Sequence, residues 1–188
     1  MSGPDRLPPI PDADLTAAQR AAAEALTAGP RGKLAGPFVP LLRSPELMAR
    51  VQKVGEYLRF ESALPERIKE LAILVVARHW GQGYEWSFHL PLALKAGVSR
   101  AAAEAVASGH RPAGLTADEA AAYGLLDELL RTHQAGDDAY AAALAAFGEA
   151  GVVELIGFCG YYGLLAMVMN AARTPAPDAE IPLEFPLP

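Results

Sequence analysis

Residues 65–97, PERIKELAILVVARHWGQGYEWSFHLPLALKAG, are the stretch that decides the fold. Apolar residues recur every three or four positions before Gly81 and after Gly83, which predicts two helices joined by a glycine-containing turn. Pro65 is typical of a first helical turn, and Gly97 is typical of a helix end. If the glycines reverse the chain, the two helices pack antiparallel.

The rest of the chain carries the same helical signals. Capping-box spacings begin at Thr16 and Thr116, and Ser44 followed by Pro45 is typical of a helix start. Further helices are predicted at 17–29, 45–60, 117–133, 137–149 and 151–172. No segment shows sustained two-residue alternation, and the abundance of alanine favours helices. The sequence therefore predicts an all-α fold, with an ordered loop at 30–43.

The length of 188 residues favours one domain. We predict a single all-helical domain at 1–172, made of an N-terminal helix and loop (1–43) and a core (44–172). The remaining segment, 173–188, holds five prolines and is predicted to be an extended arm. Its apolar residues give it enough surface to dock on the body or on a neighbouring subunit; they are Ile181, Leu183, Phe185 and Leu187.

The charge, the cysteine content and the hydrophobic content of the chain indicate which kinds of partner and cellular setting to expect. A net charge of −6 without a lysine- or arginine-rich block argues against nucleic acid, because phosphate binding requires clustered cations. The single Cys159 cannot form an internal disulfide, and the N-terminal sequence lacks the pattern of a secretory signal. A cytoplasmic setting is expected. The hydrophobic content of 52% leads us to expect a homo-oligomer.

Residues 151–172 are apolar over about the length that spans a bilayer, with Glu154 as their single charge. Basic clusters that orient membrane helices are missing from both flanks. We therefore interpret this segment as a wholly buried helix of a core or subunit interface, and expect no membrane partner.

Glu85 and His89 are the first candidates for chemistry. On a helix they lie one turn apart on the same face, and the aromatic residues around them predict burial. A carboxylate beside a histidine suits proton transfer near neutral pH. Glu70 on the preceding helix can approach this pair if the hairpin forms. Taken alone, the spacing is also typical of a solvated helix pair.

Residues 70–99 resemble the core of the carboxymuconolactone decarboxylase and alkylhydroperoxidase-D-like family. In the redox branch a Glu is followed after twelve residues by a Cys-x-x-Cys pair and then by a His. Here Glu70 and His89 take the outer positions, whereas Gln82 and Glu85 stand where the cysteines would be. A thiol peroxidase is therefore disfavoured. Tyr84, Glu85, Trp86 and His89 are similar to the decarboxylase branch instead.

The resemblance implies a cofactor-independent lyase or isomerase acting on a small carboxylated or lactone-like substrate, as in aromatic catabolism, and assembled as a trimer or hexamer. His89 would transfer the proton, and Glu85 would orient His89 or exchange protons with it. Glu70 would complete the relay or position the substrate. The implied substrate-binding residues are Phe38, Gln82, Tyr84 and Trp86. No cofactor or metal is expected.

Two alternatives stay open at this stage. Glu70, Glu85 and His89 supply oxygen and nitrogen ligands, so they could form a metal centre if His79 also points inward. Alternatively, the protein is a non-catalytic helical oligomer that binds an apolar acid or a partner chain. A substrate carboxylate would need a cation, for which Arg43, Arg67 and Arg78 are the candidates.

Overall fold

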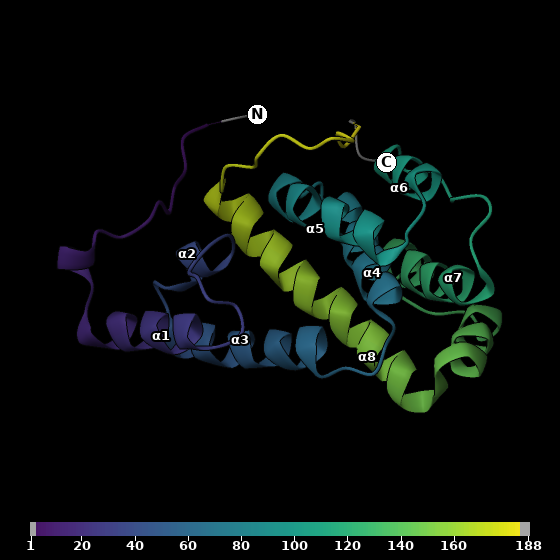
Figure 1. Cartoon of the computed structure of the whole chain (residues 1–188), viewed down its shortest axis with the longest axis horizontal. Coiled ribbons are helices and arrows are strands. Elements are labelled where there is room, and N and C mark those ends of the chain that lie inside the picture. The colour runs from purple at the N-terminus through teal and green to yellow at the C-terminus, as the bar shows by residue number, and fades with distance from the viewer. Residues whose placement is uncertain (1–2, 185–188) are drawn as a thin grey trace.

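The computed structural model describes residues 3–184, and the described chain contains helices, turns and loops without any strand (Figure 1). The all-α prediction is confirmed. Phe185 and Leu187, which were expected to help dock the arm, lie outside the described residues. The elements in chain order are η1 (Asp12–Asp14), α1 (Ala17–Ala28), α2 (Phe38–Leu41), α3 (Pro45–Phe60), α4 (Glu66–His79), α5 (Gly83–Ala96), α6 (Arg100–Ala107), α7 (Ala117–Thr132) and α8 (Asp137–Ala172).

Helices α4 and α5 form the predicted hairpin. Gly81 adopts a positive φ of 59°, a conformation that glycine reaches without strain, and this reverses the chain. Gln82 then caps α5, because its side-chain oxygen accepts hydrogen bonds from the amides of Tyr84 and Glu85. Although Pro91 lies within α5, the helix continues through it to Ala96 and does not restart.

Helix α4 is the centre of the fold. It packs against α5, α7 and α8, and every residue from Ile68 to Arg78 is buried. A helix buried all round places its polar side chains in the protein interior, where they require partners. Glu70 and Arg78 are both in this position, two turns apart.

Helix α8 crosses the molecule and contacts the N-terminal α2 and α3 as well as α4 and α7 (Figure 1). Its backbone is not helical at Gly148, so it consists of two helical segments, as the sequence predicts. Val153, Ile156 and Met167 are exposed on α8, so the helix is not wholly buried within one protomer, and its burial in a subunit interface stays a prediction. By length and composition α8 could cross a membrane, but half of its most apolar stretch is buried in the protein, as in a core helix.

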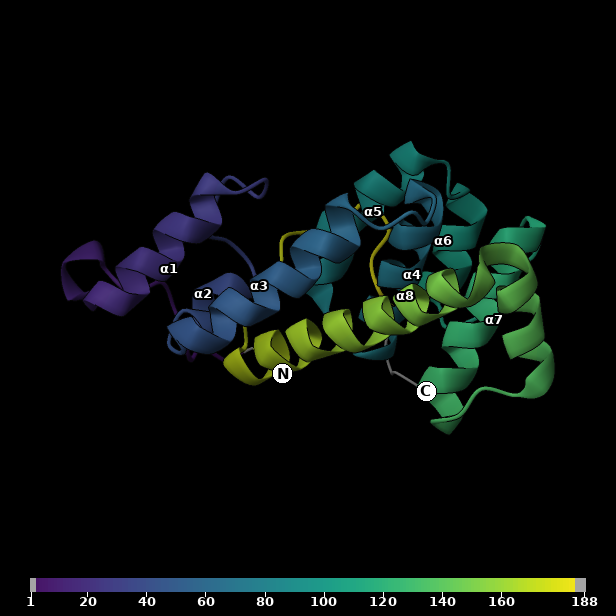
Figure 2. The same cartoon turned by 90° about the horizontal axis from the view of Figure 1, so that it is seen from below.

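Helix α3 lies alongside α8, as the view from below shows (Figure 2). Gly55 permits this contact: a Cβ atom there would lie 1.9 Å from the hydroxyl of Tyr161 on α8. The loop before α3 is ordered, as expected, and it contains the short helix α2. This arrangement places residues 30–37 beside both α5 and α8.

The C-terminal arm docks on its own protomer. Trp86 Nε1 donates to the carbonyl of Ile181 at 2.6 Å, and Ser87 Oγ donates to the carbonyl of Pro177 at 2.7 Å. Further along, the amide of Glu184 donates to the carbonyl of Ala107 at the end of α6. The described part of the arm therefore covers one side of α5.

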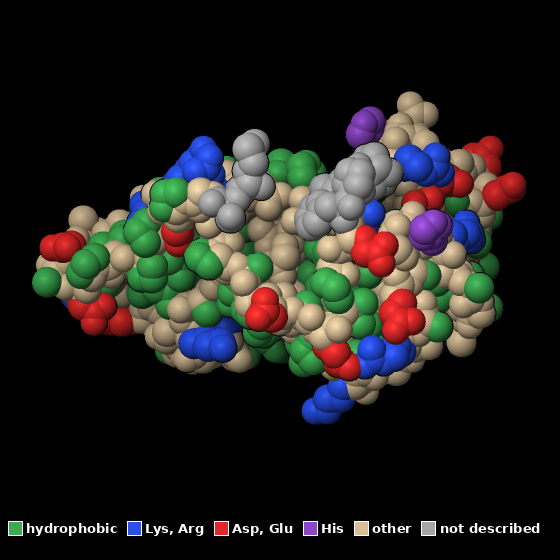
Figure 3. All heavy atoms as spheres, turned by 90° about the horizontal axis from the view of Figure 1, so that it is seen from above, with side chains coloured by type: hydrophobic (Ala, Val, Ile, Leu, Met, Phe, Trp, Pro, Cys, Tyr) green, Lys and Arg blue, Asp and Glu red, His purple; other side chains and the backbone are tan. Residues whose placement is uncertain are grey.

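The face seen from above carries scattered charges (Figure 3). Acidic and basic side chains are interspersed with apolar ones, and no extended basic patch is visible on this face. This pattern differs from the clustered cations that bind nucleic acid backbones.

Candidate active site

A cavity of about 230 Å³ lies between α3, α5, α8 and the loop before α2. Much of its wall is aromatic, from Phe38, Phe60, Tyr84, Phe88 and Tyr162. Its polar groups come from Arg31, Lys33, Arg59, Glu85 and His89. The cavity thus combines an apolar wall with a few ionisable groups, which is typical of a small-molecule site.

His89 and Glu70 are paired at the inner side of this cavity. His89 Nδ1 lies 2.7 Å from Glu70 Oε2, and both side chains are buried. Because an ionised carboxylate only accepts hydrogen bonds, we assign the ring proton to Nδ1. Nε2 then carries the lone pair, which is the tautomer that a general base requires, and in this structure Nη1 of Arg59 lies 3.2 Å from it.

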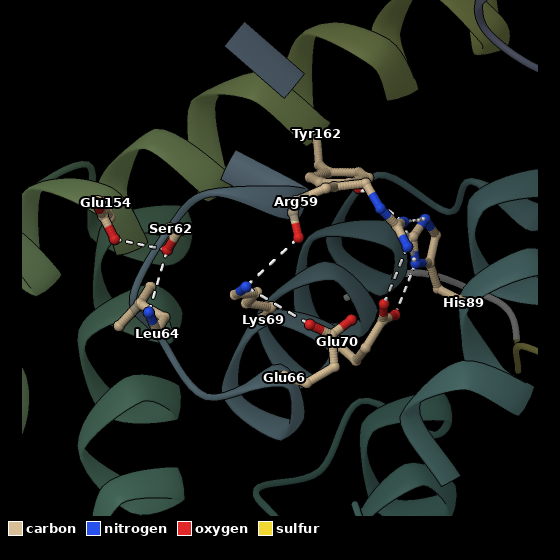
Figure 4. Close-up of polar contacts among 9 residues, drawn as sticks. All are labelled: Arg59, Ser62, Leu64, Glu66, Lys69, Glu70, His89, Glu154 and Tyr162. Carbon is tan, nitrogen blue, oxygen red and sulfur yellow. Dashed lines mark hydrogen bonds and ion pairs between the residues drawn. The ribbon is translucent and has the colours of Figure 1, made fainter. Parts of the chain in front are cut away.

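Arg59, in the last turn of α3, completes the cluster (Figure 4). Its Nη2 lies 3.5 Å from Glu70 Oε1, and its Nη1 lies 3.2 Å from His89 Nε2. The same Nη1 donates to the hydroxyl of Tyr162 at 3.4 Å. A buried carboxylate is thereby shared between an arginine and a histidine, which keeps both partners in place.

The loop between α3 and α4 positions Arg59. Lys69 Nζ donates to the carbonyl of Arg59 at 3.4 Å, so α4 holds the end of α3 (Figure 4). Ser62 Oγ donates to Glu154 on α8 at 2.6 Å and accepts from the amide of Leu64. The single charge of the apolar 151–172 segment therefore anchors the turn that aims Arg59 into the cavity.

Burial lowers the pKa of His89, and the hydrogen bond and negative charge of Glu70 oppose that shift. The positive charge of Arg59 lowers the pKa further. Near neutral pH His89 is therefore uncharged and able to accept a proton.

Glu85 behaves differently from the other carboxylates. It is 3% exposed, and neither carboxyl oxygen has a hydrogen-bond partner within the described residues. Burial raises the pKa of Glu85 well above the ordinary value. The amides at the start of α5 do not offset this effect, because Gln82 already accepts from them. A carboxyl group in this setting keeps its proton at pH values where an exposed glutamate has lost it.

The comparison with protein families bears on this hairpin. The model of the carboxymuconolactone decarboxylase family matches residues 45–128, from the start of α3 into α7. This part of the chain is similar to that family. Arg59, Glu70, Glu85 and His89 all lie within the family segment, whereas Arg31 and Lys33 precede it.

A solved structure supports the fold over a longer range. The chain is similar to a crystal structure from Agrobacterium tumefaciens, of a protein of unknown function described as a candidate AhpD antioxidant defence protein. The TM-score is 0.65 at 21% identity, covering 73% of this chain and 95% of that chain. This similarity concerns the fold. No curated protein matches the chain.

The segment that matches the family model holds its predicted residues in an unexpected arrangement. Glu70, rather than Glu85, is bonded to His89, since Glu85 has no hydrogen-bond partner. The expectation that Glu85 orients His89 is therefore wrong in this structure. The four-residue spacing places both side chains on one cavity, but Glu70 from the neighbouring helix reaches the ring nitrogen.

Two of the four predicted substrate-binding residues line the cavity. Phe38 and Tyr84 do so. Gln82 and Trp86 do not: Gln82 is buried as the cap of α5 and donates to Asn170, and Trp86 is buried against the C-terminal arm. Their positions in the motif gave no sign that a glutamine could cap the helix or that the indole would face away from the cavity.

The cations predicted to bind a substrate carboxylate lie elsewhere. Arg43 donates to the carbonyls of Val39 and Pro8, Arg67 pairs with Asp118 and Glu119, and Arg78 donates to the carbonyl of Ala107. None of the three lines the cavity beside His89. Arg31, Lys33 and Arg59 supply its positive charge instead, and only the folded loops bring them together.

Two further predictions concern metal and thiol chemistry. Among the residues that the structure describes, no group of three or more His, Cys, Asp or Glu side chains could hold a metal ion. The free thiol of Cys159 is half-buried on α8, and burial raises its pKa, so little reactive thiolate forms at neutral pH. Cys159 does not line the cavity beside His89.

Proposed function

We propose that this protein is a cofactor-independent lyase or isomerase that moves a proton to or from carbon in a small carboxylated or lactone-like substrate. The observation that carries the proposal is that two buried ionisable side chains, an imidazole and a carboxyl group, line one cavity. His89 is the base, and Glu85 is the acid. Environments that shift two ionisable groups in opposite directions are typical of acid and base partners.

In an isomerisation, the bound substrate would take the place of Nη1 of Arg59 beside Nε2 of His89, and Nε2 would remove a proton from the carbon beside a carbonyl group. In a substrate with a neighbouring C=C bond, the electron pair would move into the carbonyl to give a dienolate, and Glu85 would deliver its proton to the far carbon while the double bond shifts. Glu70 would stabilise the imidazolium, because its carboxylate accepts the hydrogen bond from Nδ1. Proton exchange with water would restore both groups.

A decarboxylation would use the same groups. The carbon–carbon bond to the carboxylate would break, carbon dioxide would leave, and the electron pair would enter a conjugated carbonyl. Glu85 would then protonate the resulting carbanion. Arg59 beside His89 would stabilise the negative charge that develops on the carbonyl oxygen.

The cavity charge supports an anionic substrate. Arg31, Lys33 and Arg59 face the cavity, and Glu85 is neutral when protonated. Arg59 is already bonded to Glu70, so Arg31 and Lys33 are the cations available to a substrate carboxylate. Arg31 lies 4.7 Å from the centre of the Phe38 ring, which holds the guanidinium over the aromatic wall.

A proton-exchange assay tests the proposal. Small β-keto acids and carboxylated lactones would be incubated with the protein in heavy water, and loss of carbon-bound hydrogen would be followed by NMR together with product mass. We expect exchange or turnover with the intact protein, and a loss of at least about hundredfold in His89→Gln. Glu104→Gln, at an exposed glutamate on α6, is the matched control. Equal exchange by all three proteins, or none by any of them, would exclude the proposed chemistry and leave a binding function.

We also propose that the protein forms a homo-oligomer. An exposed apolar strip follows one face of α8 through Val153, Ile156 and Met167, and Val54 and Tyr57 on α3 are exposed as well. Tyr57 on α3 donates to Glu154 on α8 at 2.5 Å, so the exposed apolar residues of the two helices lie on one surface. Light scattering on the purified chain tests this proposal, with Ile156→Glu expected to reduce the particle mass. A monomer mass for the intact protein would refute it.

A further inference from the structure

A second cavity, of about 410 Å³, lies between the C-terminal end of α4, the end of α6 and α7. It shares no lining residue with the cavity beside His89. The sequence suggested its arginine Arg78 as a candidate cation for the first site. The proposed proton-transfer chemistry does not use this residue.

Arg78 is the unusual group in this cavity. It is 7% exposed, and its Nε donates to the carbonyl of Ala107 at 2.8 Å. Within residues 3–184 no carboxylate forms an ion pair with it, and no acceptor is bonded to its two terminal nitrogens. The bond to Ala107 satisfies a carbonyl at the end of α6, and it leaves the terminal N–H donors of Arg78 without a protein partner among the described residues, although these nitrogens are not sealed from solvent.

The backbone beside Arg78 makes room for its guanidinium group. Gly109 has a positive φ of 76°, and a Cβ atom there would lie 2.6 Å from Nη2 of Arg78. A side chain at position 109 would therefore displace the guanidinium group. The glycine keeps that group at the cavity wall.

The other lining residues define what could bind. Arg131 and Asp127 pair at 3.4 Å and balance one another, so the charge of Arg78 remains when the histidines are neutral. His79 and His133 add hydrogen-bonding nitrogens. The rest of the wall is mainly apolar, from Val75, Val106, Leu130 and the ring of Tyr123. A small organic carboxylate with an apolar body matches both the charge and this wall.

We infer that this cavity is a second ligand site, in which the terminal nitrogens of Arg78 bind the carboxylate of a small apolar acid. The planar guanidinium group presents two parallel donors to the two oxygens of a carboxylate, which is the geometry of a bidentate pair. The apolar body would lie against Leu130 and Val106. This inference does not depend on the chemistry at His89.

The probe for the experiment is 4-iodobenzoate. Because Arg31 and Lys33 make the first cavity cationic as well, the titration would use Lys33→Gln as the parent protein, which weakens carboxylate binding beside His89. Isothermal titration would compare this parent with Lys33→Gln carrying Arg78→Gln, Arg131→Gln or Arg50→Gln. Arg50 is the matched control, since it is an exposed arginine on α3 far along the chain from the cavity. Crystals grown with the probe would locate the iodine by its anomalous scattering.

We expect Arg78→Gln to raise the dissociation constant of the probe by about tenfold or more, because a buried bidentate partner is lost. Arg131→Gln leaves Asp127 uncompensated at the cavity mouth, so it should weaken binding by several-fold. Arg131 is 63% exposed, so this variant decides the question if Arg78→Gln fails to fold. Arg50→Gln should bind like the parent. Iodine between α4 and α7 would support the site, whereas unchanged affinity in Arg131→Gln and in any folded Arg78→Gln, or iodine found elsewhere, would overturn it.

Discussion

Nδ1 of His89 lies 2.7 Å from the carboxylate of Glu70, whereas Glu85, one turn earlier on the same helix as His89, has no hydrogen-bond partner in the described chain. The difference in hydrogen bonding gives the two carboxyl groups different roles. Glu70 is shared with Arg59 and His89, so it serves as a counter-ion. Glu85 is desolvated, so it retains its proton and is available to give it away.

The first prediction concerns the pH dependence of the proposed exchange reaction. His89 must be uncharged to accept a proton, so activity should rise with pH through its lowered pKa, which places the acid limb below pH 6.5. Glu85 must be protonated, so activity should fall at a pH well above 4.5. Initial rates of substrate deuteration between pH 4 and 10 would show this bell. An activity that rises steadily to pH 10 would contradict the role of Glu85.

The second prediction uses the two charges that face His89. Glu70 raises the pKa of His89 and Arg59 lowers it. Glu70→Gln should therefore move the acid limb to lower pH, and Arg59→Gln should move it to higher pH. Both variants would also lower the rate, so the position of the limb is the informative measurement. Shifts in the same direction would show that the limb does not report His89.

The third prediction concerns stability. In the unfolded chain Glu85 ionises near its ordinary pKa of 4.5, whereas the folded protein holds the proton to higher pH. The unfolded state therefore binds fewer protons in this range, and the free energy of unfolding should decrease as pH rises from 4.5 to the folded pKa. Glu85→Gln removes this loss.

Thermal melts of the two proteins at pH 5 and pH 8 would measure the effect. We expect the melting temperature of Glu85→Gln, relative to the parent, to be higher at pH 8 than at pH 5. Glu104→Gln should show no such difference, because its carboxylate is exposed in both states. A constant difference between Glu85→Gln and the parent would mean that Glu85 ionises in the folded protein as it does in the unfolded chain.

The hairpin could be predicted from sequence because its signals are local. Glycines at Gly81 and Gly83 break the helical periodicity, and once α4 and α5 pack antiparallel, Glu70 lies next to His89. The break in α8 was also predicted to within two residues, since glycine near 150 interrupts an otherwise helical composition.

The remaining site groups depend on contacts that a sequence does not display. Arg59 enters the cavity because Ser62 binds Glu154, 92 positions away, and no spacing rule connects those residues. Arg31 enters because the loop before α2 folds back toward α8, where its Nη2 donates to Tyr161 at 3.1 Å. Gln82 was placed in the site by its motif position, although its side chain is long enough to cap the helix that follows.

The fourth prediction tests the loop that carries Arg31 and Lys33. Gly36 has a positive φ of 58°, and a Cβ atom there would lie 2.5 Å from Cε1 of Tyr84, a residue of the cavity wall. Gly36→Ala must therefore move either the tyrosine ring or the loop. We expect a raised KM for an anionic substrate, because Lys33 and Tyr84 would no longer hold their positions around it.

Gly32→Ala is the matched control for this change. Gly32 has a φ of 69°, and nothing lies within 4 Å of a Cβ atom placed there. Both variants therefore carry the backbone strain of a left-handed alanine, about 1–2 kcal/mol, and both should lower the melting temperature by a similar amount. Only Gly36→Ala should change KM. Equal KM values in the two variants would show that strain in the loop, rather than contact with Tyr84, governs substrate binding.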